Sequence, residues 1–257
     1  MIRVRLNASE LAIITGHNKY QNVDELREKI LIRNRLKKGI LIKNDIQKAI
    51  LSIKNTDILN TIKKELKLSP NTTKKELESH IHKTYIQPMV HKDTEQKSHK
   101  ELQTLLESLP VTNKLLSTPA YKDLIKQRGT INEPKSLHKS EQRNKVMITN
   151  RNDKLYTTQL YQDSACTIIL QGKIDGMTNG DTVVESKNRA RRLFYKIPNY
   201  EKVQLEAYMC LTNTEKSLHI ENFNKTTNEL YYYHDETFWN KCKEKIIEFT
   251  TNMVSSL

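Results

Sequence analysis

Apolar residues recur every three or four positions over most of the first half of the chain. This spacing predicts helices at residues 7–16, from Val23 onward, and at residues 44–53, 57–66 and 73–86. Residues 21–120 are therefore expected to form a string of short helices. The polar run at residues 91–101 is expected to be an exposed linker or the solvated face of a helix.

The periodicity changes in the second half of the chain. A helix is expected over residues 121–127 and another from Arg128 into the 140s. Segments rich in β-branched and aromatic residues then predict strands at residues 145–149, 154–160, 165–170 and 182–187. A helix at residues 199–211, strands at 217–223 and 229–234, and a last helix from Thr237 complete the pattern. This order predicts an α/β fold, with a helical region at residues 1–120 and a core at 121–257.

Composition limits the class of protein. The chain has 257 residues, of which 36% are hydrophobic and 28% charged, and this balance is typical of a folded, helix-rich domain. The three cysteines are widely spaced, so neither a disulfide framework nor a zinc site is indicated. No apolar stretch is long enough to span a bilayer, and no secretory leader follows Met1. We expect a soluble intracellular protein without a membrane partner.

The charge of the chain suggests a class of partner. The formal net charge is +13, and such a protein attracts polyanions because binding releases their counterions. Nucleic acid is the leading candidate, although an acidic protein surface or an anionic membrane also fits the charge alone.

The segment at residues 172–188 carries the most informative chemistry. Side chains alternate along a strand, so Glu185 and Lys187 are expected on one face. A turn at residues 178–181 would fold Asp175 back beside Glu185. Carboxylates are the ligands that Mg²⁺ prefers, and a bound Mg²⁺ activates water for phosphodiester hydrolysis. The alternative is a plain hairpin with a surface ion pair between Glu185 and Lys187.

Two further groups of residues accompany this cluster. Arg189, Arg191 and Arg192 follow it and would suit phosphate contacts, or form only a solvated run of charge. Gln204 and Tyr208 are four positions apart and so share one face of a helix.

In combination, these residues resemble the PD-(D/E)XK nucleases, and within them the phage lambda exonuclease and YqaJ-type viral recombinase group. That group shows an RG-x-x-x-E helix, an Asp after a strand, E-x-K on the next strand, and a Q-x-x-x-Y helix. All four elements occur here in order, as Arg128 to Glu133, then Asp175, then Glu185 with Lys187, then Gln204 with Tyr208.

The resemblance implies a fold and a set of roles. The fold would be a restriction-endonuclease-like core, in which helices flank a mixed central sheet, with an N-terminal helical extension. Glu133, Asp175 and Glu185 would hold Mg²⁺, which Mn²⁺ would replace, Lys187 would be the catalytic lysine, and Gln204 would position it or the attacking water. DNA contacts are expected from Arg5, Ser9, Arg128, Asn188, Arg189, Arg191, Arg192 and Tyr208.

The activity implied is 5′ to 3′ degradation of duplex DNA from an end, in recombination, repair or viral genome processing. A single-strand annealing or recombination protein is an expected partner, and a viral origin would place the protein in the host cytoplasm or nucleus. The alternatives are a structure-specific or nicking endonuclease, an RNA endonuclease, and a DNA-binding protein without catalysis.

Two departures from the group limit what the resemblance implies. About a hundred mostly helical residues separate Ser9 from the RG-x-x-x-E helix, so the ring-shaped trimer of part of the family does not carry over. Pro134 directly follows Glu133, and it is expected either to mark a bend or to displace Glu133 from ideal helical geometry.

Overall fold

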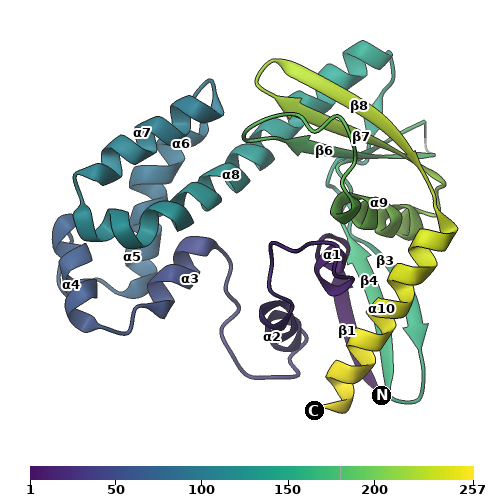
Figure 1. Ribbon diagram of the computed structural model, residues 1–257, viewed down its shortest axis with the longest axis horizontal. Helices are drawn as coiled ribbons and strands as arrows, with labels where there is room; N and C mark the ends of the chain where they lie inside the picture. The colour runs from purple at the N-terminus through teal and green to yellow at the C-terminus, as the bar shows by residue number, and fades with distance from the viewer. Residues whose placement is uncertain (180) are drawn as a thin grey trace.

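A single long helix, α8 (Pro110–Asn144), connects a helical part of the molecule to a part that contains all the described strands. The computed structural model describes residues 1–179 and 181–257. Figure 1 shows the helical part on one side, the strands on the other, and α8 running from one into the other. Both chain termini lie in the part with the strands.

The helical part consists of short helices that pack on the N-terminal half of α8. They are α3 (Asp45–Ser52), α4 (Thr56–Glu65), α5 (Lys74–Ile81), the π-helical turn η2 (His82–Ile86), α6 (Gln87–Val90) and α7 (Glu95–Glu107). Polar residues cap them, for example Asn55 on α4 and the capping box of Thr73 with Glu76 on α5. Their apolar faces bury Ile46, Ile62 and Leu77 in a core that is separate from the core of the sheets.

The strands form two sheets. The first has the order β1-β4-β3, from β1 (Ile2–Asn7), β4 (Cys166–Gly172) and β3 (Tyr156–Gln162), with β1 parallel to β4. The second has the order β2-β5-β6-β7-β8, from β2 (Ile148–Thr149), β5 (Gly176–Thr178), β6 (Thr182–Asn188), β7 (Lys216–Phe223) and β8 (Thr226–Tyr233). Strands β6 and β7 are parallel and the other pairs of this sheet are antiparallel, so both sheets are mixed.

Helices cover the sheets. The turn η1 (Ala8–Glu10) and helix α1 (Leu11–Ile14) follow β1, and α2 (Val23–Arg33) follows them. Helix α9 (Asn199–Thr212) contacts strands of both sheets, and α10 (Glu236–Ser255) packs against α9 and β4. Trp239 of α10 is buried in this core. Mixed sheets flanked by helices confirm the predicted α/β class.

The structure adds one strand for which no element was predicted and joins two expected helices into one. Residues 2–7 form strand β1, because Val4 and Leu6 alternate inward and the backbone pairs with β4. The two helices expected after residue 120 are one, α8, which continues through Pro119 and Pro134 because its two halves pack on different cores through Leu124 and Leu137. The boundary expected at residue 120 therefore falls inside a helix.

Smaller differences concern the limits of two segments. The strand expected at residues 145–149 is reduced to β2, since Lys145 takes a left-handed conformation that ends α8. The polar run at 91–101 is part loop and part α7, and its Ser98 is fully buried. Gly180, within the predicted turn at 178–181, lies outside the described residues. Among the described helices, none combines the length and apolar character that crossing a membrane requires.

Candidate active site

The predicted cluster lies at an open edge of strand β6. On one side β7 pairs with all of β6, whereas on the other side β5 pairs with β6 only from Thr182 to Val184. Asp175 directly precedes β5, and its Oδ2 atom accepts a hydrogen bond of 2.8 Å from the backbone N–H of Ser186. The carboxylate of Asp175 thus fills the place where a strand partner would bind, next to Glu185.

Lys187, the predicted catalytic lysine, donates hydrogen bonds to two side chains. Lys187 Nζ donates to Glu185 Oε1, and it donates to Gln204 Oε1 over 3.0 Å. The amide of Gln204 in turn donates from Nε2 to the Tyr208 hydroxyl over 2.9 Å. Glu185, Lys187, Gln204 and Tyr208 therefore form one connected chain of hydrogen bonds between β6 and α9.

A glycine allows α9 to lie close enough for this contact. A Cβ atom added at Gly172, the last residue of β4, would lie 2.9 Å from Tyr208 Cε1 and 3.1 Å from Ala8 Cβ. The first contact is shorter than real Cβ atoms show and the second is tight, so a larger residue here would require α9 and the turn after β1 to shift.

Glu133 reaches the cluster from α8. This carboxylate is half-buried and accepts a hydrogen bond from the Asn152 amide. Burial raises the pKa of Glu133, and the nearby negative charge of Glu185 raises it further, while Lys187 acts in the opposite direction. Glu133 therefore lies within electrostatic reach of both residues, and its part in a shared metal site stays a prediction.

The electrostatics of the cluster are those of crowded negative charge. Burial raises the pKa of Asp175 well above its usual range, and the charges of Glu185 and Glu133 add to this effect. Burial alone would lower the pKa of Lys187, but the charge and hydrogen bond of Glu185, together with the charges of Glu201 and Asp175, outweigh burial, so the pKa of Lys187 is raised and the side chain is an ammonium. A cation that binds here would relieve the repulsion between the carboxylates.

The cluster fits a hard divalent cation in the chemistry of its donors. Glu185 Oε2 is buried and has no hydrogen-bond partner, although buried polar atoms nearly always have one. The neighbouring donors are carboxylate oxygens, which Mg²⁺ prefers. Within residues 1–179 and 181–257, no three His, Cys, Asp or Glu side chains are arranged closely enough to hold a metal together. Lys187, Asn152 and the Ser186 N–H occupy oxygens of Glu185, Glu133 and Asp175 respectively.

A buried network of ion pairs around Arg189 lies at the end of β6, two residues after Lys187. Arg189 donates two hydrogen bonds, of 2.6 and 2.7 Å, to Glu201 and one of 2.7 Å to Glu221, and His219 contacts Glu201 at 2.8 Å. Arg189 was expected to contact DNA, but its guanidinium is paired with the internal carboxylates of Glu201 and Glu221 and its side chain is nearly buried. Sequence reasoning missed Glu201, Glu221 and His219, and nothing in their spacing marks them as partners of Arg189.

Two other residues expected to touch DNA also have internal partners. Arg128 is 6% exposed, pairs with Glu95 at 2.9 Å and donates to the backbone carbonyls of Val90 and Lys92. It therefore holds α8 to the segment before α7 instead of facing solvent. Tyr208 is 5% exposed and serves as the support of Gln204.

The remaining expected DNA contacts lie where solvent reaches them. Arg5, Ser9, Arg191 and Arg192 are exposed. Ser9 follows the end of β1, whose partner strand β4 leads directly to Asp175, so both residues lie at the same end of this sheet. Asn188 is half-buried and bonded to Ser136 and to the carbonyl of Gly129. Whether these residues touch DNA stays a prediction.

Solved structures with a similar arrangement include nucleases. An alkaline exonuclease from Laribacter hongkongensis matches with a TM-score of 0.43 and 11% identity, over 68% of this chain and 93% of that one. Its complex with dAMP matches with a TM-score of 0.42 and 13% identity, over 68% and 93% of the two chains. A phage-related exonuclease from Haemophilus somnus 129PT matches with a TM-score of 0.41 and 11% identity, over 51% and 71%.

Both solved proteins are named exonucleases. No protein-family model and no curated protein matches the chain. The functional assignment therefore depends on the side chains of the site itself.

Proposed function

We propose that this protein is a divalent-metal-dependent DNA nuclease of the PD-(D/E)XK kind. The observation that carries the proposal is the hydrogen-bonded chain Glu185, Lys187, Gln204 beside the carboxylate of Asp175. A surface ion pair, the alternative interpretation of Glu185 and Lys187, does not account for a Glu185 side chain that is 5% exposed and has one unpaired oxygen.

Each residue has a distinct role in this proposal. Asp175 and Glu185, with Glu133, would hold the metal, which when bound lowers the pKa of a coordinated water and offsets charge on the phosphate. Lys187, protonated and fixed by Gln204, donates a hydrogen bond to the attacking water or to a phosphate oxygen. Gln204 sets the position of the ammonium, and Tyr208 sets the position of Gln204.

The charge of the molecule favours DNA as the substrate. The net charge of +13 favours a polyanion, and Arg191 and Arg192 are exposed in the loop that follows the site. Degradation of duplex ends in the 5′ to 3′ direction, within recombination, repair or viral genome processing, is carried over from the family resemblance.

A digestion of end-labelled duplexes tests the function. In the presence of Mg²⁺, we expect a label at the 5′ end of linear duplex DNA to be released before a label at the 3′ end. Closed circular DNA of the same sequence is expected to stay intact. Cleavage of the circle would replace the exonuclease assignment by an endonuclease. Absence of cleavage with Mg²⁺ and Mn²⁺, on DNA and on RNA, would reject nuclease function and leave a DNA-binding protein.

A further inference from the structure

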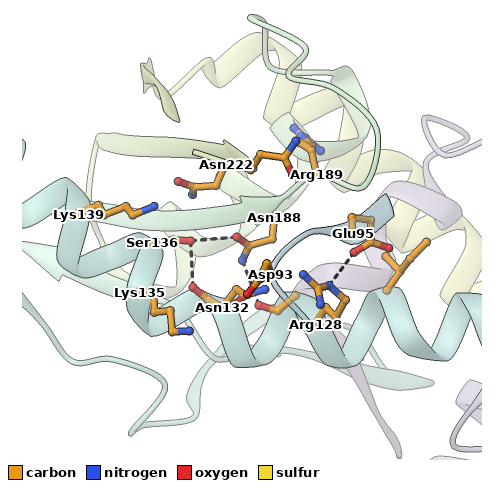
Figure 2. Close-up of a pocket in the computed structure, with 13 residues that line it drawn as sticks. Asp93, Glu95, Arg128, Asn132, Lys135, Ser136, Lys139, Asn188, Arg189 and Asn222 are labelled. Atoms are coloured by element: carbon orange, nitrogen blue, oxygen red, sulfur yellow. Dashed lines mark hydrogen bonds and ion pairs between the residues drawn. The ribbon is translucent and has the colours of Figure 1, made fainter. Parts of the chain in front are cut away.

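A polar cavity lies between α8 and the ends of β6 and β7, the elements that also carry Glu133 and Lys187. It measures about 210 Å³, below the roughly 300 Å³ at which pockets for drug-sized ligands begin, and suits a smaller group. Figure 2 shows its lining residues, which come from α8, from the ends of the two strands and from the segment before α7. The proposed catalytic residues are not part of this lining.

One side chain of the lining has an unused hydrogen-bond donor. Asn222, at the end of β7, is 7% exposed, and its Oδ1 accepts a hydrogen bond of 2.9 Å from the Thr227 hydroxyl. That bond fixes the orientation of the amide and leaves Nδ2, which is buried and has no partner. In Figure 2 the amide end of Asn222 faces the side of the cavity that carries Lys139 and Ser136. A buried donor without a partner indicates a ligand that accepts hydrogen bonds.

The uncommitted charges around the cavity are positive. Lys135 and Lys139 lie one turn apart on α8, are exposed, and have no ion-pair partner among the described residues. The other charged groups of the lining have partners: Arg128 pairs with Glu95, and Arg189 with Glu201 and Glu221. Asp93, whose side chain is 85% exposed, lies 3.6 Å from Lys97. Glu95 keeps one oxygen without a partner, but Arg128 compensates its charge. The cavity therefore favours an anion.

The polar floor of the cavity is already satisfied and ordered. The Ser136 hydroxyl contacts both the Asn132 carbonyl and Asn188 Oδ1 at 3.0 Å, and Asn188 Nδ2 donates to the carbonyl of Gly129 over 3.0 Å. These bonds lock α8 to the end of β6. The donors that remain for a ligand include Asn222 Nδ2 and the ammonium groups of Lys135 and Lys139.

We propose that this cavity binds a backbone phosphate of the DNA strand, at a position away from the bond that is cut. The proposal rests on the nuclease function proposed above. Chain continuity places the two sites together, since Asn188 follows Lys187 on β6 and Asn132 precedes Glu133 on α8. Successive side chains of β6 point to opposite faces, so the end of this strand separates the two sites. The cavity contact holds the DNA strand in register while Lys187 acts on the phosphodiester that is cut.

Binding of a short fluorescent duplex in EDTA tests the site without any cleavage. The double variant Lys135→Gln, Lys139→Gln is expected to lose about tenfold in affinity and to show a weaker salt dependence by about two phosphate contacts. Asn222→Asp keeps the acceptor for Thr227 but replaces the free donor by a carboxylate, and it is expected to lose at least as much. Circular dichroism melting checks that each variant folds. If Asn222→Asp does not fold, the variant of the two exposed lysines still decides the test.

The matched control removes the same charge from the same helix. Lys114→Gln with Lys122→Gln changes two exposed lysines in the N-terminal half of α8, at least ~19 Å along the helix from Lys135. We expect this pair to change affinity by less than about threefold. Equal losses in the control and cavity variants would overturn the proposal, because general electrostatic attraction would then explain both.

A second arm separates a strand phosphate from a free one. Inorganic phosphate and dAMP are titrated while the side-chain amide resonances of Asn222 are followed by NMR. A saturable shift of these resonances by the duplex, with weak or no effect of the free compounds, supports the proposal. Tight binding of dAMP or phosphate, with duplex affinity unchanged in the cavity variants, overturns it in favour of a small-molecule site.

The two proposals fail in distinguishable ways. Wild-type protein that binds duplex through the cavity but cleaves nothing with Mg²⁺ or Mn²⁺ refutes the nuclease and keeps the phosphate site. Protein that cleaves normally, while its cavity variants bind like the control, refutes the phosphate site and keeps the nuclease. Wild-type protein that binds no DNA refutes both.

Discussion

Lys187 donates a hydrogen bond to Gln204 over 3.0 Å, and this contact ties strand β6 to helix α9 at the candidate active site. The same ammonium also contacts Glu185, so its position is set by one charged and one neutral partner. The neutral partner is the more informative one, because an amide positions the ammonium without neutralising it. Gln204 is therefore a positioning residue, and its loss should affect the rate of cleavage more than the binding of DNA.

Replacing Gln204 by Met tests this role. The variant keeps the length of the side chain but removes the acceptor for Lys187, and we expect kcat to fall roughly 10-fold to 100-fold with KM changed less than about threefold. The melting temperature should stay close to that of the wild type. Tyr208→Phe is the matched second variant, since it removes only the hydroxyl that holds Gln204. It should show a smaller loss of kcat in the same direction, and a dominant rise in KM in either variant would contradict the positioning role.

The site residues themselves are tested by Lys187→Met and Glu185→Gln. Each variant is expected to lower cleavage at least roughly 100-fold, because each removes an interaction with the reacting groups. DNA affinity in EDTA should change little for Lys187→Met, since most of the binding comes from other cations. Single-turnover cleavage and fluorescence anisotropy measure the two effects separately. Substantial cleavage by either variant would remove the residue from the site.

The sequence predicted the elements of the site better than their surroundings. Asp175, Glu185 and Lys187 were predictable because the alternation of a strand and one turn are local rules. Gln204 and Tyr208 were predictable as a pair through their four-residue spacing, but not which of them faces the lysine. Which of the two side chains faces Lys187 depends on how closely α9 approaches Gly172, and this is a contact between residues far apart in the chain.

The arginines show where local reasoning fails. Arg128 belongs to the RG-x-x-x-E motif and Arg189 to a run of cations, and both residues were expected to contact DNA. Their partners, Glu95 for Arg128 and Glu201 with Glu221 for Arg189, lie 12 or more positions away and come from separate elements. Nothing in the sequence pairs them, so burial of both side chains was not predictable. The single helix α8 was missed for the same reason, because only tertiary packing carries it through Pro119 and Pro134.

The buried position of Arg128 leads to a prediction about the free energy of unfolding. Arg128→Met would leave Glu95, whose side chain is 11% exposed, without its cation, and removing one partner of a buried pair costs about 3 to 5 kcal/mol. Urea denaturation measures this loss. Arg143→Met, on the same helix with a side chain that is 52% exposed, is the control and should cost less than about 1 kcal/mol. Adding Glu95→Gln to Arg128→Met should recover part of the loss, and no recovery would argue against the pair as its cause.

The network around Glu201 gives a pH dependence. Burial alone would raise the pKa of Glu201, but hydrogen bonds from Arg189 and His219 outweigh burial and hold the pKa at about 2. A depressed pKa means that the ionised carboxylate stabilises the fold above its unfolded value of 4.5, and that this stabilisation is lost as the pH falls toward about 2. Its size is on the order of 3 kcal/mol.

Glu201→Gln measures that contribution. At pH 7 the variant should be less stable than the wild type by a few kcal/mol in urea, and the difference should shrink as the pH is lowered below about 4.5. Glu244→Gln, at an exposed position of α10, is the control and should leave the difference near zero at every pH. A gap between wild type and Glu201→Gln that is constant with pH would show that packing, not charge, is lost.

Removal of divalent cations tests the donor set of Asp175, Glu185 and Glu133. We expect EDTA to stop cleavage, Mg²⁺ or Mn²⁺ to restore it, and Ca²⁺ to support binding of DNA with little turnover, because the looser coordination of Ca²⁺ positions water poorly.

Asp175→Asn should raise the Mg²⁺ concentration that gives half-maximal cleavage at least about tenfold, since it removes one charged oxygen donor from a buried position. The same variant also relieves repulsion among the carboxylates, so its unfolding free energy in EDTA should be equal to that of the wild type or higher. Isothermal titration with Mn²⁺ and urea denaturation in EDTA measure the two effects. A variant that binds Mn²⁺ like the wild type would exclude Asp175 as a ligand, and cleavage that persists in EDTA would exclude metal chemistry at this site.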